Sequence, residues 1–172
     1  MKPLLGITGL CGGDVGLALS IPRQGLGNSA IAAVANEEQL ERLGNTWAAM
    51  AITEPGAGSD SGAIRTTATK DGDDYIINGE KIYITAGERA DAIVVWASLD
   101  RSKGKAAIKS FVVDKGTPGM TLERLEKKLG IRPSDTAAVR LENCRVPNDN
   151  PPGPPAISLH KRLAGTTPTT PP

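Results

Sequence analysis

The 172-residue sequence has no excess of either charge. Lysine and arginine number 20 against 19 aspartates and glutamates, which gives a formal net charge of +1. A chain so close to neutrality has no overall field to attract nucleic acid or an anionic membrane surface. We therefore expect its partners to be recognised by shape and local chemistry, with no nucleic acid among them.

Cysteine and histidine are scarce. Cys11 and Cys144 lie far apart without a CxxC pattern, which argues against a zinc site and against a disulfide-stapled secreted fold. We interpret both as reduced, buried thiols. The one histidine, His160, has no carboxylate or cysteine near it in sequence. We therefore predict no metal site and assign His160 no catalytic role.

Long apolar runs are also missing. None approaches the ~20 residues that cross a bilayer as a helix. The N-terminal stretch MKPLLGITGLCGG is short and broken by glycines, and Leu10 is too large for a signal-peptide cleavage site. The sequence therefore predicts a protein without a membrane span, located in the cytoplasm or, in a eukaryote, in the mitochondrial matrix.

Residues 16–47 favour helix. They are alanine-rich, and their apolar side chains recur at spacings of three and four. Asn28, or the serine after it, would cap a first short helix. Asn36 and Gln39 resemble a capping box for a second helix, which would end at Gly44. Two short helices are therefore predicted before the next region.

Residues 50–147 change to an alternating pattern rich in β-branched side chains. Asn78–Gly79 stands between two apolar runs and predicts a hairpin turn. Further strands are predicted at 92–99, 107–114, 119–125 and 136–147. Short strands separated by turns, with no long helical pattern between them, indicate a mostly β fold, an antiparallel sandwich or barrel. Residues 150–172 are rich in proline and threonine and predict a disordered tail.

A glycine-rich loop, MAITEPGAGSDSG, occupies residues 50–62. Its glycines let the backbone approach a ligand closely, and Pro55 biases Glu54 away from helical angles. A surface connection and a phosphate-binding loop are both open interpretations. The chain has no GxxxxGK[ST], and no GxGxxG lies between a strand and a helix, so a mononucleotide P-loop is not indicated.

The segment KIYIT, residues 81–85, adds a second candidate feature. On a regular strand Tyr83 and Thr85 share one face, while Ile82 and Ile84 share the other and enter the core. The pair on the first face could be an ordinary exposed surface of a sheet. It could also bind a planar heterocycle such as a flavin, which would stack on the phenol and hydrogen-bond to the hydroxyl.

Three blocks together resemble the central domain of the acyl-CoA dehydrogenases. They read MAITEPGAGSD, YIINGEKIYITAGERAD and KKLGIRPSDTAAVRLENCRVP, in the family's order and spacing, and the resemblance extends over residues 16–147. It implies a β-barrel middle domain over 48–149 that binds flavin and acyl-CoA. Residues 1–47 would then be a remnant of an N-terminal helical domain, and 150–172 the tail. In the third block, Ser134, Asp135 and Thr136 would begin the strand that closes the sheet.

The resemblance implies flavin adenine dinucleotide (FAD) as the cofactor. Its implied contacts come from the first two blocks: Met50, Ala51, Ile52, Thr53, Gly58, Ser59, Tyr83, Ile84 and Thr85. Residues 50–53 would lie along the isoalloxazine, and Gly58 and Ser59 near the pyrophosphate, with Ser59 also touching the acyl-CoA. Tyr83 stands where the family usually has a tryptophan, and Thr85 would lie near the reactive flavin nitrogen.

The family's reaction is the α,β-dehydrogenation of an acyl-CoA thioester, with proton abstraction by a carboxylate and hydride transfer to FAD. In the family that base is a glutamate on a C-terminal helical bundle, for which we find no counterpart in this sequence. We therefore expect a fragment that is inactive alone, its parent a homo-oligomer. Glu54, Asp60 and Glu88 are not expected to replace the base. A flavin-dependent oxidase or monooxygenase, and a non-catalytic β binding module, remain alternatives.

Overall fold

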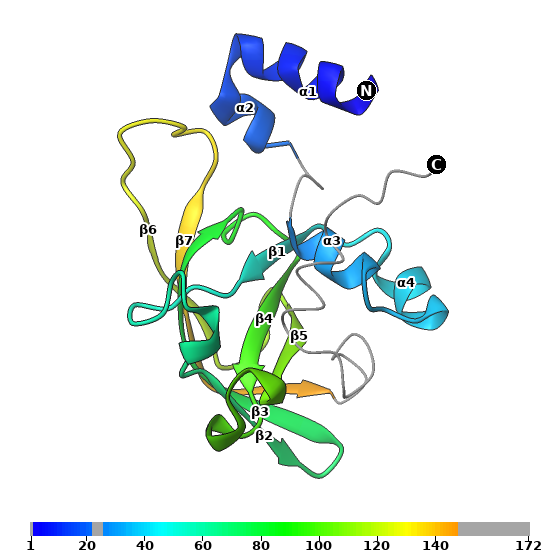
Figure 1. Cartoon of the computed structure of the whole chain (residues 1–172), viewed down its shortest axis with the longest axis vertical. Coiled ribbons are helices and arrows are strands. Elements are labelled where there is room, and N and C mark those ends of the chain that lie inside the picture. Colours follow the sequence, from blue (N-terminus) through cyan, green and yellow to red (C-terminus); the bar gives the residue numbers. More distant parts are fainter. Residues whose placement is uncertain (1, 22–25, 148–172) are drawn as a thin grey trace.

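The computed structural model describes residues 2–21 and 26–147, so the predicted tail and His160 lie outside the described residues. Helices precede the sheet (Figure 1): α1 (Lys2–Gly13), α2 (Val15–Leu19), α3 (Leu26–Ala32) and α4 (Glu37–Leu43). The strands are β1 (Ala48–Ala51), β2 (Thr67–Asp71), β3 (Asp74–Thr85), β4 (Ala92–Ser98), β5 (Ile108–Asp114), β6 (Met120–Leu125) and β7 (Thr136–Pro147). Two 3₁₀ turns, η1 (Ser61–Ala63) and η2 (Arg101–Ala107), lie between strands.

The strands form one curled, barrel-like sheet in the order β1-β4-β2-β3-β7-β6, with β5 also paired to β4. The predicted mostly β fold with short preceding helices is therefore confirmed. Most pairs are antiparallel, but β4 runs parallel to both β1 and β2. Alternation along a strand reports burial and carries no information on the direction of its neighbour, which is why the pattern alone predicted a purely antiparallel sheet.

The core has two parts, one on each face of β4. On one face Tyr75 of β3 meets Phe111 of β5 edge to face, with ring centroids 5.1 Å apart. The two rings belong to a cluster with other side chains of β3, β5 and β7. On the other face, Ile31 of α3 and Leu43 of α4 pack in a cluster with Trp96. All seven residues of β4 are buried in consequence, which fits the unbroken apolar run AIVVWA that precedes Ser98.

The predicted capping box of α4 is confirmed, whereas the predicted cap of α3 at Asn28 is wrong. The side chain of Asn36 caps α4 and forms the reciprocal capping box with Gln39, and the helix ends at Gly44. Asn28 does not cap α3, because the helix already begins at Leu26. The Asn28 amide instead donates to the carbonyl of Thr46 (2.6 Å) and accepts from the amide of Ala48 (3.0 Å). It therefore ties α3 to β1. Helices α1 and α2 lie within residues 1–47, for which the resemblance implied a helical remnant, but the sequence pattern predicted neither helix individually.

The predicted hairpin turn at Asn78–Gly79 is wrong. Strand β3 continues through these residues, and the β2–β3 turn lies at Gly72, whose φ of +61° suits glycine. Gly79 instead marks a register shift against β7. A Cβ there would lie 2.3 Å from the Thr66 hydroxyl oxygen, so glycine permits this close approach. The packing of β3 against β2 and β7 overrides a local turn signal.

Cys144 is fully buried, as predicted, whereas Cys11 is only partly buried. Burial raises the pKa of the Cys144 thiol to about 11, which keeps it protonated and unreactive near neutral pH. Among the described residues, no helix is both long and apolar enough to cross a membrane. Nor do carboxylate and cysteine side chains in that part of the chain gather into a group that could hold a metal ion.

Candidate functional site

A cavity of about 340 Å³ opens between the helical segment, strand β1 with the residues on either side of it, and the end of β3. That volume is in the range of small-molecule pockets, roughly 300–1,000 Å³. Its walls are mainly apolar and aromatic, with hydroxyls from Thr53 and Thr85. The lining residues are Leu19, Ile21, Leu26, Trp47, Met50, Ile52, Thr53, Ile82, Tyr83, Thr85 and Ala86.

The cavity brings together some of the residues that the sequence nominated for flavin binding. Those that line it are Met50, Ile52, Thr53, Tyr83 and Thr85. Ala51 and Ile84 lie buried in the core and do not line the cavity, while Gly58 and Ser59 are exposed outside its lining. The arrangement thus groups the implied isoalloxazine contacts more closely than the implied pyrophosphate contacts.

Trp47 is the lining residue that sequence reasoning should have noticed. It is one of two tryptophans in the chain and stands immediately before β1, three residues before Met50. An aromatic so near the nominated loop was a usable signal. Leu19, Ile21 and Leu26 could not have been found, because only the packing of the helical segment against the sheet brings them to this cavity.

A β-bulge shapes the part of the cavity around Tyr83. Lys81 pairs with Val139 and Ile84 with Ala137, so β3 carries one extra residue there. Tyr83 has a φ of +57°, which is uncommon for a bulky residue. The regular alternation predicted for residues 82–85 is therefore wrong in one respect, since Ile82 joins Tyr83 and Thr85 in the cavity lining. Tyr83 as a whole remains 62% exposed.

Glu54, in a turn to which the family resemblance gives a structural or solvent-facing role, is buried, with only 6% of its surface exposed. Its carboxylate accepts hydrogen bonds from the Lys81 ammonium (2.8 Å) and the Thr66 hydroxyl (2.6 Å). It also accepts from the backbone amides of Thr66 (3.0 Å) and Arg65 (2.6 Å). Lys81, fully buried, donates in addition to the carbonyl of Ile52 (3.0 Å). The pair thus braces the loop after β1 against β3, directly behind the cavity.

Burial and pairing act in opposite directions on these two groups. Burial alone would raise the pKa of Glu54, but the hydrogen bonds and the charge of Lys81 outweigh it and lower that pKa below 4.5. Burial lowers the pKa of Lys81 to about 8, although Glu54 opposes that shift. The lowered pKa of Glu54 favours its charged form, whereas the lowered pKa of Lys81 favours its neutral form. The four hydrogen bonds to the carboxylate favour an ion pair at neutral pH.

We expect stability to fall as the pH drops below about 4.5. The pKa of Glu54 is lower in the folded chain than in the unfolded one, so its stabilising contribution is complete above the unfolded value of 4.5. That contribution is lost as the pH falls through the folded value. The measurement is urea unfolding of the wild type and of the Glu54→Gln/Lys81→Met double variant between pH 7 and pH 3. The double variant should lose less, and parallel curves would contradict the assignment.

The other carboxylates considered as substitute bases are also engaged or remote. Asp60 caps η1 by accepting from the amide of Gly62 (3.2 Å), and Glu88 is exposed. Within residues 2–21 and 26–147, the cavity lining includes no aspartate, glutamate or histidine. The cavity therefore supplies apolar surface, two aromatic rings and two threonine hydroxyls, with no group suited to remove a proton from carbon.

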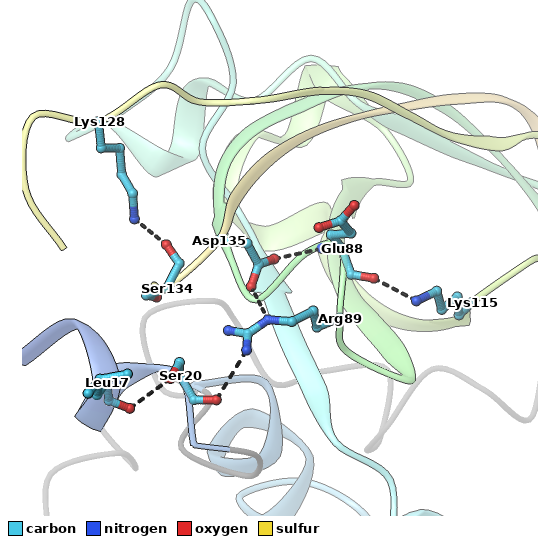
Figure 2. A network of polar contacts seen from close by, with 8 residues as sticks. All are labelled: Leu17, Ser20, Glu88, Arg89, Lys115, Lys128, Ser134 and Asp135. Carbon is cyan, nitrogen blue, oxygen red and sulfur yellow. Dashed lines mark hydrogen bonds and ion pairs between the residues drawn. The ribbon is translucent and has the colours of Figure 1, made fainter. Parts of the chain in front are cut away.

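A polar network centres on Arg89 and Asp135 (Figure 2). Asp135 accepts from the Arg89 guanidinium (2.7 Å) and from the amide of Glu88 (2.9 Å), and Lys115 donates to the carbonyl of Glu88 (2.6 Å). Strand β7 begins at Thr136, as predicted, and Asp135 fixes the turn after β3 just ahead of it. Arg89 continues the network to the carbonyl of Ser20 (3.4 Å).

The chain matches a family model described as "Acyl-CoA dehydrogenase, middle domain" over residues 49–144. It is 46% identical over 116 residues to the mitochondrial short-chain specific acyl-CoA dehydrogenase of Rattus norvegicus, an alignment covering 67% of this chain and 28% of the rat protein. It is 37% identical to an acyl-CoA dehydrogenase of Bacillus subtilis (strain 168) over 87% of this chain and 41% of that protein.

Among solved structures, butyryl-CoA dehydrogenase from Megasphaera elsdenii superposes with a TM-score of 0.81 at 34% identity. The match covers 89% of this chain and 43% of that one. The aligned part of the chain thus spans less than half the length of each of these relatives. What is matched is their middle domain, together with part of the preceding helical segment in the longer alignments.

Proposed function

Because the chain belongs to the acyl-CoA dehydrogenase family through its middle domain, we propose that the cavity beside β1 and β3 binds the isoalloxazine of FAD. We further propose that the enzyme to which this chain contributes oxidises acyl-CoA thioesters at the α and β carbons. One observation carries the proposal: Trp47, just before the matched segment, lines one cavity together with Tyr83, Thr53 and Thr85 of that segment. Residues 48–149 would form the flavin- and acyl-CoA-binding unit.

The residues present fit a flavin ring. A planar heterocycle can stack on the exposed phenol of Tyr83 and the indole of Trp47, while Met50, Ile52 and Ile82 supply an apolar bed. The hydroxyls of Thr53 and Thr85 can donate to ring heteroatoms. Bound there, a flavin supplies a hydride acceptor for the β hydrogen of the substrate.

Removal of the α proton is assigned to a group beyond the described residues. Glu54 already accepts four hydrogen bonds and lies behind the cavity wall, so it is not poised to take a proton from carbon. The contribution of this chain is then to bind and orient the flavin and to keep water from one side of it. We place Ser59 at the acyl-CoA side on the strength of the family resemblance.

We expect the purified chain to retain FAD after incubation and desalting, with an absorbance band near ~450 nm. Tyr83→Ala should raise the dissociation constant about fivefold or more, because a stacking aromatic contributes on the order of 1–3 kcal/mol. Tyr83→Trp should bind FAD at least as tightly as the wild type. Fluorescence titration of FAD measures all three constants.

Leu129→Ala serves as the matched control, because Leu129 is fully exposed in the β6–β7 loop and does not line the cavity. It should bind FAD like the wild type. A wild-type chain that stays colourless, or a Tyr83→Ala variant with unchanged affinity, would contradict the proposed site. If FAD is retained, acyl-CoA should leave its spectrum unchanged in the absence of oxygen, because the cavity lining, among the described residues, supplies no group to remove the α proton. Reduction of the bound FAD by acyl-CoA would contradict the expectation that this chain is inactive alone.

A further inference from the structure

We propose that Arg89 is a positioning residue that assembles three separate parts of the cavity wall and holds Trp47 in place for the ligand. The inference deepens the proposed function and rests on it for the identity of the ligand, a flavin. Arg89 does not line the cavity itself, so any effect it has on binding acts through its neighbours. Its side chain reaches each of the three wall segments or the residue adjoining it.

The first segment is the turn after β3. Asp135 accepts from the Arg89 Nε atom (2.7 Å) and from the amide of Glu88 (2.9 Å), and its backbone carbonyl accepts from the amide of Ala86 (3.1 Å). The turn that carries Thr85 and Ala86 into the cavity is therefore fixed to the start of β7 through one aspartate. Because the Asp135 side chain is only 9% exposed, this ion pair is less screened than a surface pair.

The second segment is Trp47. The Arg89 guanidinium carbon lies 5.5 Å from the centroid of the indole ring, within the range of a cation–π interaction. The backbone of Trp47 is held separately, since its amide donates to the Asp91 carboxylate (2.9 Å) and its carbonyl accepts from the amide of Asp91 (2.9 Å). Arg89 therefore restrains a side chain whose backbone is already fixed, which makes its effect specific to the ring.

The third segment is the helical one. Arg89 Nη1 donates to the carbonyl of Ser20 (3.4 Å), the residue that ends α2 between the cavity-lining Leu19 and Ile21. Figure 2 shows the guanidinium between Asp135 and Ser20, on the path from the sheet to the helical segment. A planar guanidinium with several donors can hold a carboxylate, a carbonyl and an aromatic face at once, which an ammonium cannot do.

The test compares Arg89→Met, Arg89→Lys and Arg145→Met. Methionine keeps the length of the stem and removes the guanidinium. Arg145 is a matched control, because it too is an arginine in ion pairs, with Asp74 (2.9 Å) and Asp71 (2.5 Å), and does not line the cavity. Thermal unfolding first establishes that each variant is folded.

One readout needs no flavin. Trp96 is fully buried, so acrylamide quenching of tryptophan emission reports mainly on Trp47. We expect the quenching constant to rise about twofold in Arg89→Met, to rise less in Arg89→Lys, and to stay unchanged in Arg145→Met. An unchanged constant in folded Arg89→Met would overturn the restraint on Trp47, whether or not the chain binds FAD.

The second readout is the dissociation constant for FAD. We expect an increase of about fivefold to tenfold in Arg89→Met, partial recovery in Arg89→Lys and wild-type affinity in Arg145→Met. If quenching rises but FAD affinity does not change, the positioning role is overturned while the flavin site stands. If the wild type does not bind FAD, the proposed function fails. The positioning role toward flavin fails with it, and the quenching data decide the restraint alone.

Discussion

Lys81→Met should lower the free energy of unfolding by about 3–5 kcal/mol, one of the two largest effects that we expect from a single substitution in this chain. The change leaves Glu54 buried and ionised without its cation. It also removes the bond from the Lys81 ammonium to the carbonyl of Ile52, so the cavity-lining loop loses an anchor. Urea unfolding at pH 7, followed by circular dichroism, measures the effect.

The double variant Glu54→Gln/Lys81→Met separates pairing from packing. Replacing both members of a buried pair by neutral groups of similar shape is often far less costly than removing one of them. We expect the double variant to recover at least half of the stability that Lys81→Met loses. As a control, Lys103→Met breaks an exposed pair with Asp100 and should change stability by no more than about 0.5 kcal/mol. Equal losses in Lys81→Met and Lys103→Met would refute the buried ion pair.

Gly27→Ala should destabilise the chain by about 3 kcal/mol, because the site has no room for a methyl group. A Cβ on Gly27 would lie 2.3 Å from the carbonyl oxygen of Ala49 and 2.4 Å from that of Ala48. Both are backbone atoms of β1, so neither can rotate away, and α3 would have to lift from the strand. The expected result is a lower temperature midpoint of unfolding. Leu26, the neighbour of Gly27 in α3, should also be held less firmly in the cavity wall. Differential scanning calorimetry gives the midpoint.

Gly56→Ala is the matched control, because a Cβ there meets nothing within 4 Å and the residue is exposed. It should leave the midpoint within about 2 °C of the wild type. The Asn28→Ala variant offers a second view of the same contact, since it removes the amide that ties α3 to β1 without adding volume. If Gly27→Ala melts with the wild type, the close approach of α3 to β1 is incorrect.

The strands were largely predictable, because alternation and β-branched residues report burial directly. The ends of β5, β6 and β7 fall within one residue of their predictions, as do the capping box and end of α4. The turn at Asn78–Gly79 failed since its local preference competes with pairing on both sides of β3. The alternating pattern also could not predict which strands run parallel, because β1 and β4 pair although β2 and β3 separate them in the sequence.

In the candidate site, too, features carried by local sequence were predicted, and features that depend on residues distant in the sequence were missed. Met50, Ile52, Thr53, Tyr83 and Thr85 were nominated from two short blocks and do line one cavity. The burial of Glu54 was missed, because its partners Thr66 and Lys81 are 12 and 27 residues away in sequence. The bulge that brings Ile82 into the cavity lining was also missed, since an extra residue in one strand is visible only against its partner.

Strand β4 has a consequence for how the chain tolerates change. Val94 and Trp96 contact the cluster that includes α3 and α4, while Ile93 and Val95 belong to the cluster beneath β3 and β7. Because both faces of β4 are buried, a change in side-chain volume at any of its positions affects the packing. Substitutions there will be accepted mainly when a neighbour on the same face changes with them. Val94 and Trp96 should therefore vary with the helical segment, and Ile93 and Val95 with the side chains of β3 and β7.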